Sequence, residues 1–348
     1  MADDAEVVAR VDAVLADTVR TQRAHWSAVD SDLDAVFAEI ERLVLGGGKR
    51  LRPRFCHWGW VAAGGGAESS KQVRLGAAIE LLHVCALFHD DVIDDAATRR
   101  GAPAAHRTFA SAHAREQWAG ESRRFGEGAA ILIGDITFVM ADMLMDGVSN
   151  EARSLWHELR LEVNVGQYLD VLGGARRERR LEVAERICRY KSAKYTVERP
   201  LHLGAFAADE AVGVRIAPML SEYGVSLGEA FQMRDDVLGA FGDAGVTGKP
   251  VGGDFREGKP TPMLARAHAV ADDVQRAVLD LVGTADLADS DVARIQQVVV
   301  DTGALVETER IISSLRDRAI TALDPALLAG DSHRALVELA VAVTSRNA

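Results

Sequence analysis

Leu81-Leu82-His83-Val84-Cys85-Ala86-Leu87-Phe88 is followed, after one histidine, by Asp90-Asp91-Val92-Ile93-Asp94-Asp95, so four carboxylates come directly after an apolar run. The run predicts a buried helix, on which residues four apart share a face, so Asp90 and Asp94 repel each other. The C-terminal end of a helix also carries the negative end of its dipole, which adds to the cost of the cluster. A cluster this costly points to a function.

Carboxylates at this spacing suit Mg²⁺, which proteins usually hold through one or two carboxylates, several waters and the phosphates of a substrate. The segment therefore indicates a site for a diphosphate and Mg²⁺. A solvated acidic helix end explains an isolated Asp-Asp-x-x-Asp pattern equally well. The rest of the chain has to decide between these interpretations.

The composition favours a helical globular protein. Hydrophobic residues make up 48% of the 348 residues, which is ample for a large core, and aromatic residues only 5%. Alternating β-branched runs are scarce, so helix is favoured over strand throughout. The formal net charge of -12 argues against a general affinity for nucleic acid or for an anionic membrane.

Apolar residues recur at three- and four-residue intervals along most of the chain. This pattern predicts helices over residues 6–26, 32–45, 49–64, 71–95, 123–145, 151–172, 176–208, 216–241 and parts of 104–120 and 263–348. Pro200 is expected to kink or break one of them. Loops are predicted at 98–103 and at 242–262, the longest segment without periodicity. One all-α domain spanning residues 1–348 is the simplest interpretation.

The three cysteines, Cys56, Cys85 and Cys188, lie far apart in apolar helical segments, which predicts reduced, buried thiols. The first residues are acidic and lack the features of a signal peptide, and no apolar run reaches the ~20 residues of a membrane span. We therefore expect a cytoplasmic protein.

A second acidic pair, Asp235-Asp236, lies in the segment from Phe231 to Gly239, again at the end of an apolar helical stretch. If the two helices face each other across a bundle, their carboxylates converge on a shared cavity, as metal sites in helical bundles do. Such a cavity would hold a diphosphate through several Mg²⁺ ions. The alternative is that this pair lies on the surface.

Basic residues near these clusters supply possible phosphate contacts. They are Lys49, Arg52, Arg99, Arg100, Lys191, Lys194, Lys249 and Lys259. Each alone would usually be a solvated charge. Several, however, lie beside glycine-rich turns and helix starts, where backbone N–H groups and guanidinium groups meet phosphate oxygens.

Several motifs together resemble those of trans-isoprenyl diphosphate synthases. They are Gly47-Gly48-Lys49-Arg50-Leu51-Arg52-Pro53, Glu80-Leu81-Leu82-His83, Asp90-Asp91-Val92-Ile93-Asp94, Arg99-Arg100-Gly101, Phe231-Gln232-Met233-Arg234-Asp235-Asp236, Gly248-Lys249-Pro250 and Asp254-Phe255-Arg256-Glu257-Gly258-Lys259. The resemblance spans about residues 40–265. The segment from Tyr190 to Pro200 is similar to that of actinobacterial geranylgeranyl diphosphate synthases. The family fold implied is a helical bundle around a deep apolar cavity.

The resemblance also implies roles for individual residues. The Mg²⁺ ligands, for a cluster of three ions, would be Asp90, Asp91, Asp94, Asp235 and Asp236. The allylic diphosphate would be bound by Arg99, Lys191, Lys249 and Lys259, with Ser192 and Gln232 nearby. Isopentenyl diphosphate would be bound by Lys49, Arg52, His83 and Arg100; for His83 alone, a satisfied core histidine would be the ordinary interpretation. The groups most directly involved in catalysis would be Asp90, Asp94, Arg99, Lys191, Asp235 and Lys249.

The chemistry agrees with these residue types. Breaking the allylic C–O bond leaves a carbocation and a diphosphate, whose growing negative charge is stabilised by cations. The alkene of isopentenyl diphosphate attacks the carbocation, and loss of a proton completes the step without a nucleophilic side chain. Water would quench the cation, so the cavity has to be apolar.

Product length should follow from the depth of the apolar pocket below Asp90. Cys85 and Ala86 are small at positions where family members that stop at fifteen carbons tend to carry a bulky aromatic residue. We expect a pocket floor at Leu82 or Ile79 and a twenty-carbon product, geranylgeranyl diphosphate, with a farnesyl or longer polyprenyl product as the alternative.

The second motif departs from the family pattern. Gly239 stands where the usual third aspartate would be, Asp243 follows one turn later, and Pro260 replaces a residue that is often basic or polar. These departures leave the third carboxylate open. Two other functions compete. A class I terpene cyclase shares the first aspartate motif but usually carries a different motif in place of the second aspartates and lacks the glycine-rich segment Gly46–Pro53. A non-catalytic partner subunit generally loses the first motif, which is intact here. By resemblance, the chain is expected to form a homodimer.

Overall fold

The computed structural model describes residues 4–66, 68–242, 252–284 and 286–345. Apart from one short hairpin, the regular structure of these residues is helical, as the sequence predicts. They form two compact units, residues 1–60 with 65–150 and residues 61–64 with 151–348, which are described one at a time. The single domain expected over residues 1–348 stays a prediction.

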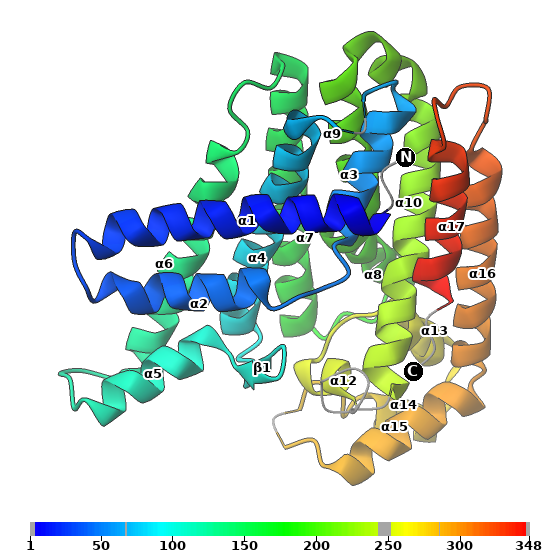
Figure 1. The fold of residues 1–348 in the computed structure, drawn as a ribbon. Coiled ribbons are helices and arrows are strands. Elements are labelled where there is room, and N and C mark those ends of the chain that lie inside the picture. Colours follow the sequence, from blue (N-terminus) through cyan, green and yellow to red (C-terminus); the bar gives the residue numbers. More distant parts are fainter. Residues whose placement is uncertain (1–3, 67, 243–251, 285, 346–348) are drawn as a thin grey trace. The chain divides into compact units, whose positions relative to one another are not determined.

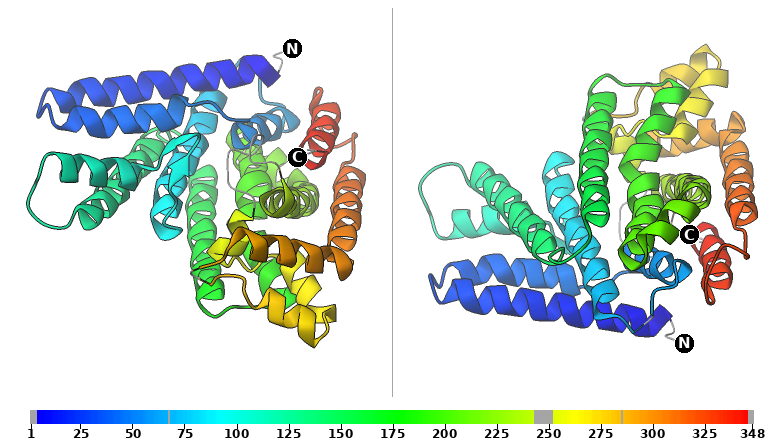
Figure 2. Two further views of the ribbon diagram at one scale, coloured as in Figure 1. Left: turned by 90° about the horizontal axis from the view of Figure 1, so that it is seen from below. Right: turned by 90° about the horizontal axis from the view of Figure 1, so that it is seen from above.

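The first unit is built on an antiparallel pair of helices and a buried third. Its elements are α1 (Asp4–Ser27), α2 (Leu33–Leu45), α3 (Leu51–Ala62, whose last residues belong to the second unit), α4 (Ser70–Ile93), β1 (Thr98–Arg99), β2 (Ala102–Pro103), α5 (Ala105–Arg115) and α6 (Ser122–Met143). Figures 1 and 2 show α1 and α2 side by side. Helix α4 packs against α6 and α1 and is apolar almost all round, because it is covered on several sides.

The loop predicted at residues 98–103 is a β-hairpin, in which Thr98 pairs with Pro103 and Arg99 with Ala102. Both residues of its turn have positive φ, 53° at Arg100 and 75° at Gly101, as a two-residue type I′ turn requires. Asparagine or aspartate usually precedes glycine in such turns, so an arginine there gave no hairpin signal in the sequence.

The second unit is centred on one long helix. Its elements are α7 (Asn150–Ala175), α8 (Leu181–Ile187), η1 (Cys188–Glu198), α9 (Arg199–Ala208), α10 (Glu210–Phe241), α12 (Gly253–Glu257), α13 (Pro262–Val270), α14 (Asp273–Leu279), α15 (Asp289–Asp301), α16 (Ala304–Ala322) and α17 (Ser332–Thr344). Helix α10 packs against η1, α9, α16 and α17 (Figure 1). Tyr223 on α10 donates its hydroxyl to the carbonyl of Leu336 at 2.7 Å, which ties α10 to α17.

Two predicted boundaries in this unit were wrong. The single helix expected over 176–208 consists of α8, the π-helix η1 and α9, and Pro200 lies in the first turn of α9, where its missing N–H costs little. Helix α10 begins at Glu210 rather than near 216, because the side chain of Asp209 accepts from the N–H of Val212 and caps it.

The remaining expectations about the fold concern the cysteines, the long loop and membrane spans. The three cysteines are free and buried, as predicted. The segment 242–262 contains the short helix α12, and its residues 243–251 lie outside the described part. Among the helices that the structure describes, none has the length and apolar character needed to cross a bilayer.

Candidate active site

The first aspartate cluster lies at the end of α4, where Asp94 caps the helix and its N–H donates to the carbonyl of Asp90 at 2.8 Å. Asp91 is 1% exposed and accepts from Nε of Arg99 at 2.7 Å. Burial raises the pKa of Asp91, and the hydrogen bond from Arg99 opposes that shift. The ion pair therefore fixes the guanidinium of Arg99 beside the aspartates, 3.8 Å from Oδ2 of Asp90.

His83 lies two to three helical turns before these aspartates on α4, within reach of several positive charges. Burial lowers its pKa well below the ordinary value, and four guanidinium groups add to this effect. They belong to Arg52, Arg100, Arg99 and Arg50. The imidazole is therefore neutral near pH 7, and the first unit brings together three residues predicted to bind isopentenyl diphosphate, Arg52, His83 and Arg100.

The glycine run before α3 lies beside Arg100. A Cβ atom at Gly48 would be in ordinary van der Waals contact with Nη2 of Arg100, at 3.4 Å, while the φ of +141° at Gly48 disfavours a side chain there. Nη1 of Arg100 donates to the carbonyl of Leu43 at 2.6 Å. Lys49, in the same loop, is exposed. The loop and the β-hairpin thus meet at the predicted phosphate-binding residues.

Arg50 has a different role from its neighbours. Its guanidinium is buried and bonds to Asp12 at 2.8 Å, Glu80 at 2.6 Å and the carbonyl of Val44 at 2.6 Å. Two carboxylates neutralise it. Arg50 and Glu80 therefore stabilise the first unit, although both lie in motifs that the resemblance picked out.

The residues expected to set product length lie along α4 on the N-terminal side of the aspartates. Ile79, Leu82 and Cys85 are buried, and Ala86 is partly exposed. Ala86 precedes Asp90 by four residues and so shares its face of α4. The Sγ atom of Cys85 lies 3.9 Å from Nδ1 of His89. Burial raises the pKa of this thiol to about 12, next to Asp135 and Thr137 of α6. Cys85 thus faces α6, and the chain-length roles stay predictions.

In the second unit, Lys191 and Ser192 lie on the π-helix η1, a type of helix often found at functional sites. Nζ of Lys191 pairs with Oδ2 of Asp170 on α7 at 2.5 Å, and Lys194 pairs with Glu162 on the same helix. The two helices approach closely at Gly166, where a Cβ atom would lie 2.3 Å from the backbone nitrogen of Lys191.

Sequence reasoning missed Asp170 and Glu162. Both lie in the middle of an ordinary amphipathic helix, and their partners are more than 20 residues away along the chain. A carboxylate without a local motif becomes a candidate only when packing places it against a predicted substrate-binding lysine. Nothing in the sequence of α7 gave that signal.

The second aspartate pair lies near the C-terminal end of α10. Asp236 is buried and accepts from Nε2 of Gln232 at 2.7 Å. Burial raises the pKa of Asp236 well above its ordinary value, and the charges of Asp254 and Asp235 add to the shift. Nζ of Lys259 lies 4.0 Å from Oδ1 of Asp254. The predicted residues Gln232, Asp235, Asp236 and Lys259 therefore lie together at this end of the unit.

Arg234, between these residues in sequence, points elsewhere. It forms two hydrogen bonds of 2.6 Å with Glu309 on α16 and one of 3.0 Å with the carbonyl of Thr344 at the end of α17. It anchors α10 to two neighbouring helices, and this anchor holds the second aspartate pair in position.

Two predicted residues, Lys249 and Asp243, lie outside the described residues, and the two aspartate pairs belong to different units. Within the described ranges, no group of three or more histidine, cysteine or acidic side chains is arranged to hold a metal ion. The donor chemistry still fits Mg²⁺, because this ion takes only one or two carboxylates and completes its shell with water and phosphate.

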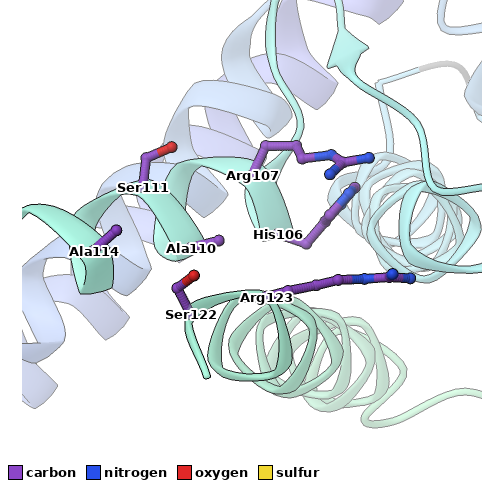
Figure 3. Close-up of a pocket in the computed structure, with 7 residues that line it drawn as sticks. All are labelled: His106, Arg107, Ala110, Ser111, Ala114, Ser122 and Arg123. Atoms are coloured by element: carbon purple, nitrogen blue, oxygen red, sulfur yellow. The ribbon is translucent and has the colours of Figure 1, made fainter. Parts of the chain in front are cut away.

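A separate pocket of about 310 Å³ opens between α5 and α6 (Figure 3). Figure 3 shows the guanidinium groups of Arg107 and Arg123 on either side of His106. Arg107 pairs with Asp95 at 2.8 Å and Arg123 with Glu127 at 2.7 Å. None of the predicted site residues lines this pocket, and its cations are neutralised by these pairs.

Comparison with known proteins shows the family to which the chain belongs. Residues 34–300 match the family model described as Polyprenyl synthetase, so the chain belongs to the polyprenyl synthetase family. It is an isoprenyl diphosphate synthase, an enzyme of the trans-prenyltransferase class.

Individual relatives agree on the class. The chain is 34% identical over 274 residues to the geranylfarnesyl diphosphate synthase of Aeropyrum pernix, covering 76% of this chain and 79% of that protein. It is 32% identical over 290 residues to the geranylgeranyl diphosphate synthase of Mycobacterium tuberculosis, covering 82% and 77%. It superposes with a TM-score of 0.87 on the geranylgeranyl pyrophosphate synthase of Corynebacterium glutamicum, solved with isoprenyl diphosphate and magnesium, at 34% identity and with 97% and 99% covered.

Proposed function

We propose that the chain condenses isopentenyl diphosphate with an allylic diphosphate in the presence of Mg²⁺ and releases geranylgeranyl diphosphate. The observation that carries the proposal is the arrangement in the first unit, where the guanidinium groups of Arg52, Arg99 and Arg100 act on a neutral His83 near the aspartates that end α4. An anion with several charges suits such a set of donors. The Corynebacterium glutamicum structure holds the same class of ligand together with magnesium.

In this proposal the aspartates and the cations divide the work. Mg²⁺, when bound, stabilises the negative charge that grows on the departing diphosphate. Asp90, Asp94 and Asp235 hold the ions, with Asp91 and Asp236 in support. Arg99, Lys191, Lys249 and Lys259 bind the allylic diphosphate, and Lys49, Arg52, His83 and Arg100 bind isopentenyl diphosphate.

No nucleophilic side chain is needed, and the thiols are unsuited to such a role. Burial raises the pKa of Cys56 to about 12 and that of Cys188 well above its ordinary value. Both thiols are therefore protonated near pH 7 and lie away from solvent.

The twenty-carbon product rests on the small residues of α4. Ala86 is small and lies on the face of α4 that also carries Asp90, which supports a product longer than fifteen carbons. The names of the two relatives above differ in product length, so the assignment depends on the pocket residues. A cytoplasmic location stays a prediction from the sequence.

A homodimer is part of the same proposal. Phe125, Leu132, Val139 and Met143 follow one another at intervals of seven, seven and four residues along α6, and each is at least 40% exposed. This spacing puts them on one face, as in helices that pair with another helix. We expect a second copy to cover it, so that Leu132→Glu yields monomers in sedimentation experiments while Arg153→Glu, on α7, leaves the dimer intact.

The activity is tested by incubating the purified protein with Mg²⁺, isopentenyl diphosphate and primers of five, ten and fifteen carbons. Mass spectrometry should show a twenty-carbon linear diphosphate. Cyclic hydrocarbons would support a terpene cyclase, and no turnover with any primer would support a non-catalytic partner subunit. A farnesyl product alone would refute the product length.

A further inference from the structure

Position 239 has a glycine where the resemblance leads one to expect a third aspartate, and the structure shows what occupies that space. A Cβ atom built on Gly239 would lie 2.3 Å from Oδ2 of Asp254 and 2.9 Å from its Cγ. Real Cβ atoms essentially never approach other atoms so closely. The carboxylate of Asp254 therefore fills the place where a side chain at position 239 would begin.

The backbone fixes Asp254 there. The N–H of Gly252 donates to the carbonyl of Gly239 at 3.1 Å, which attaches the start of α12 to the end of α10. The N–H of Lys259 donates to the carbonyl of Asp254 at 3.1 Å. Both bonds involve main-chain atoms, so they hold the backbone of the segment that carries Asp254 beside the end of α10.

The carboxylate of Asp254 lies close to the second aspartate pair. Gly239 follows Asp235 by four residues and Asp236 by three on α10, so Asp254 lies about one helical turn beyond that pair. Nζ of Lys259 lies 4.0 Å from Oδ1 of Asp254 and also pairs with Glu257. The carboxylate of Asp254 is thus directed at the same region as the two aspartates of α10.

We propose that Asp254 supplies the third carboxylate of the second aspartate motif, in place of the missing side chain at Gly239, and serves the Mg²⁺ that binds at Asp235. This inference rests on the proposed function. It assigns the third carboxylate to a residue of α12 rather than to Asp243. It also explains why position 239 is a glycine, because a side chain there would occupy the place of the Asp254 carboxylate.

The exchange of the two side chains tests the proposal. The probe is Mn²⁺ with inorganic diphosphate, and its binding is measured by electron paramagnetic resonance and by calorimetry. The readout is the Kd of Mn²⁺, which does not depend on turnover. Asp254→Ala should raise the Kd of Mn²⁺ about tenfold, the lower end of the effect of removing an outer ligand. Gly239→Asp should also weaken binding, because its new Cβ atom would collide with Asp254.

The double variant Gly239→Asp/Asp254→Ala should bind Mn²⁺ more tightly than either single variant, because the collision is gone and a carboxylate is again present. Atoms of Asp254 other than Oδ2 and Cγ lie 3.3 Å or more from the Cβ position at 239, so alanine at 254 leaves room. The matched control, Gly239→Ala/Asp254→Ala, has the same backbone and no carboxylate and should retain the full loss. Asp254→Asn, which keeps the size, should resemble Asp254→Ala.

Two results would overturn the inference: unchanged Mn²⁺ affinity in Asp254→Ala and Asp254→Asn, or equal recovery in the aspartate and alanine double variants. Melting curves without metal confirm that each variant is folded. If the wild-type protein itself binds no Mn²⁺ with diphosphate and forms no prenyl product, the proposed function fails. If the wild type binds and turns over while the exchange has no effect, only the role of Asp254 is wrong.

Discussion

Removing one partner of the buried pair of Arg50 and Glu80 should cost more stability than breaking any other ion pair near the site. Their side chains are 1% and 4% exposed, and Nη1 of Arg50 lies 2.6 Å from Oε1 of Glu80. Glu80→Met would leave a buried guanidinium with only Asp12 and one carbonyl as partners. Removing one partner of a buried ion pair costs about 3–5 kcal/mol, and we expect about 3 kcal/mol because Asp12 remains.

The assay is urea unfolding of the wild type and three variants, followed by circular dichroism. Asp12→Asn is the matched control, because Asp12 is 42% exposed and its bond to the same guanidinium should be worth less than about 1 kcal/mol. The double variant Arg50→Met/Glu80→Met removes both buried charges and should lie within about 1 kcal/mol of the wild type, as such replacements often do.

The outcome of the double variant decides the argument. If it is as unstable as Glu80→Met, the loss comes from packing at position 80 and not from an uncompensated charge. If Glu80→Met costs less than Asp12→Asn, the burial of the pair does not control its energy. In either case the structural role assigned to Arg50 would have to be withdrawn.

Three further outcomes are expected. Asp91→Asn should lower kcat/KM about tenfold, because Asp91 holds Arg99 in position and removing groups that orient a metal site has effects of that size. The control Asp142→Asn, on α6, should change kcat/KM little. Equal effects of the two substitutions would refute the positioning of Arg99 by Asp91. Ala86→Phe should shorten the product to fifteen carbons, and a twenty-carbon product from this variant would show that Ala86 does not line the pocket. Burial lowers the pKa of His202 to about 4, and the charge of Arg199 adds to the shift, whereas the pKa in the unfolded chain is about 6.5. The free energy of unfolding should therefore fall as the pH drops below 6.5, by about 2 kcal/mol between pH 7 and pH 5. If the free energy of unfolding of His202→Gln depends on pH as steeply as that of the wild type, His202 is not the origin of the pH dependence.

Periodicity predicted the helices because most of them bury one apolar face. It failed over 176–208, where η1 changes the hydrogen-bonding pattern without changing the residue types, and at the hairpin, where Arg100 adopts a positive φ that favours other residues. Such local deviations depend on tertiary contacts, so a single sequence does not carry them. Both deviations occur at predicted substrate-binding residues.

The aspartates and basic residues could be identified because they stand in motifs, but their partners could not. Asp170 lies on another helix from Lys191, and Asp254 lies on another helix from Gly239. Arg50 stands in the same motif as Lys49 and Arg52, and only the structure shows that two carboxylates hold its guanidinium. Motifs identify the type of chemistry, and packing decides which charges are left for the substrate.

The pairing of the cations has a consequence for how the enzyme binds its substrates. Arg99 is held by Asp91 and Lys191 by Asp170, so each cation is positioned before an anion arrives. A lysine or arginine fixed in this way loses less side-chain entropy on binding a phosphate than a solvated one does. The cost is competition, because the partner carboxylate already satisfies part of the charge. Mg²⁺, when bound, would offset this competition by supplying positive charge at the site, so removing divalent cations should weaken diphosphate binding more than the loss of any single lysine.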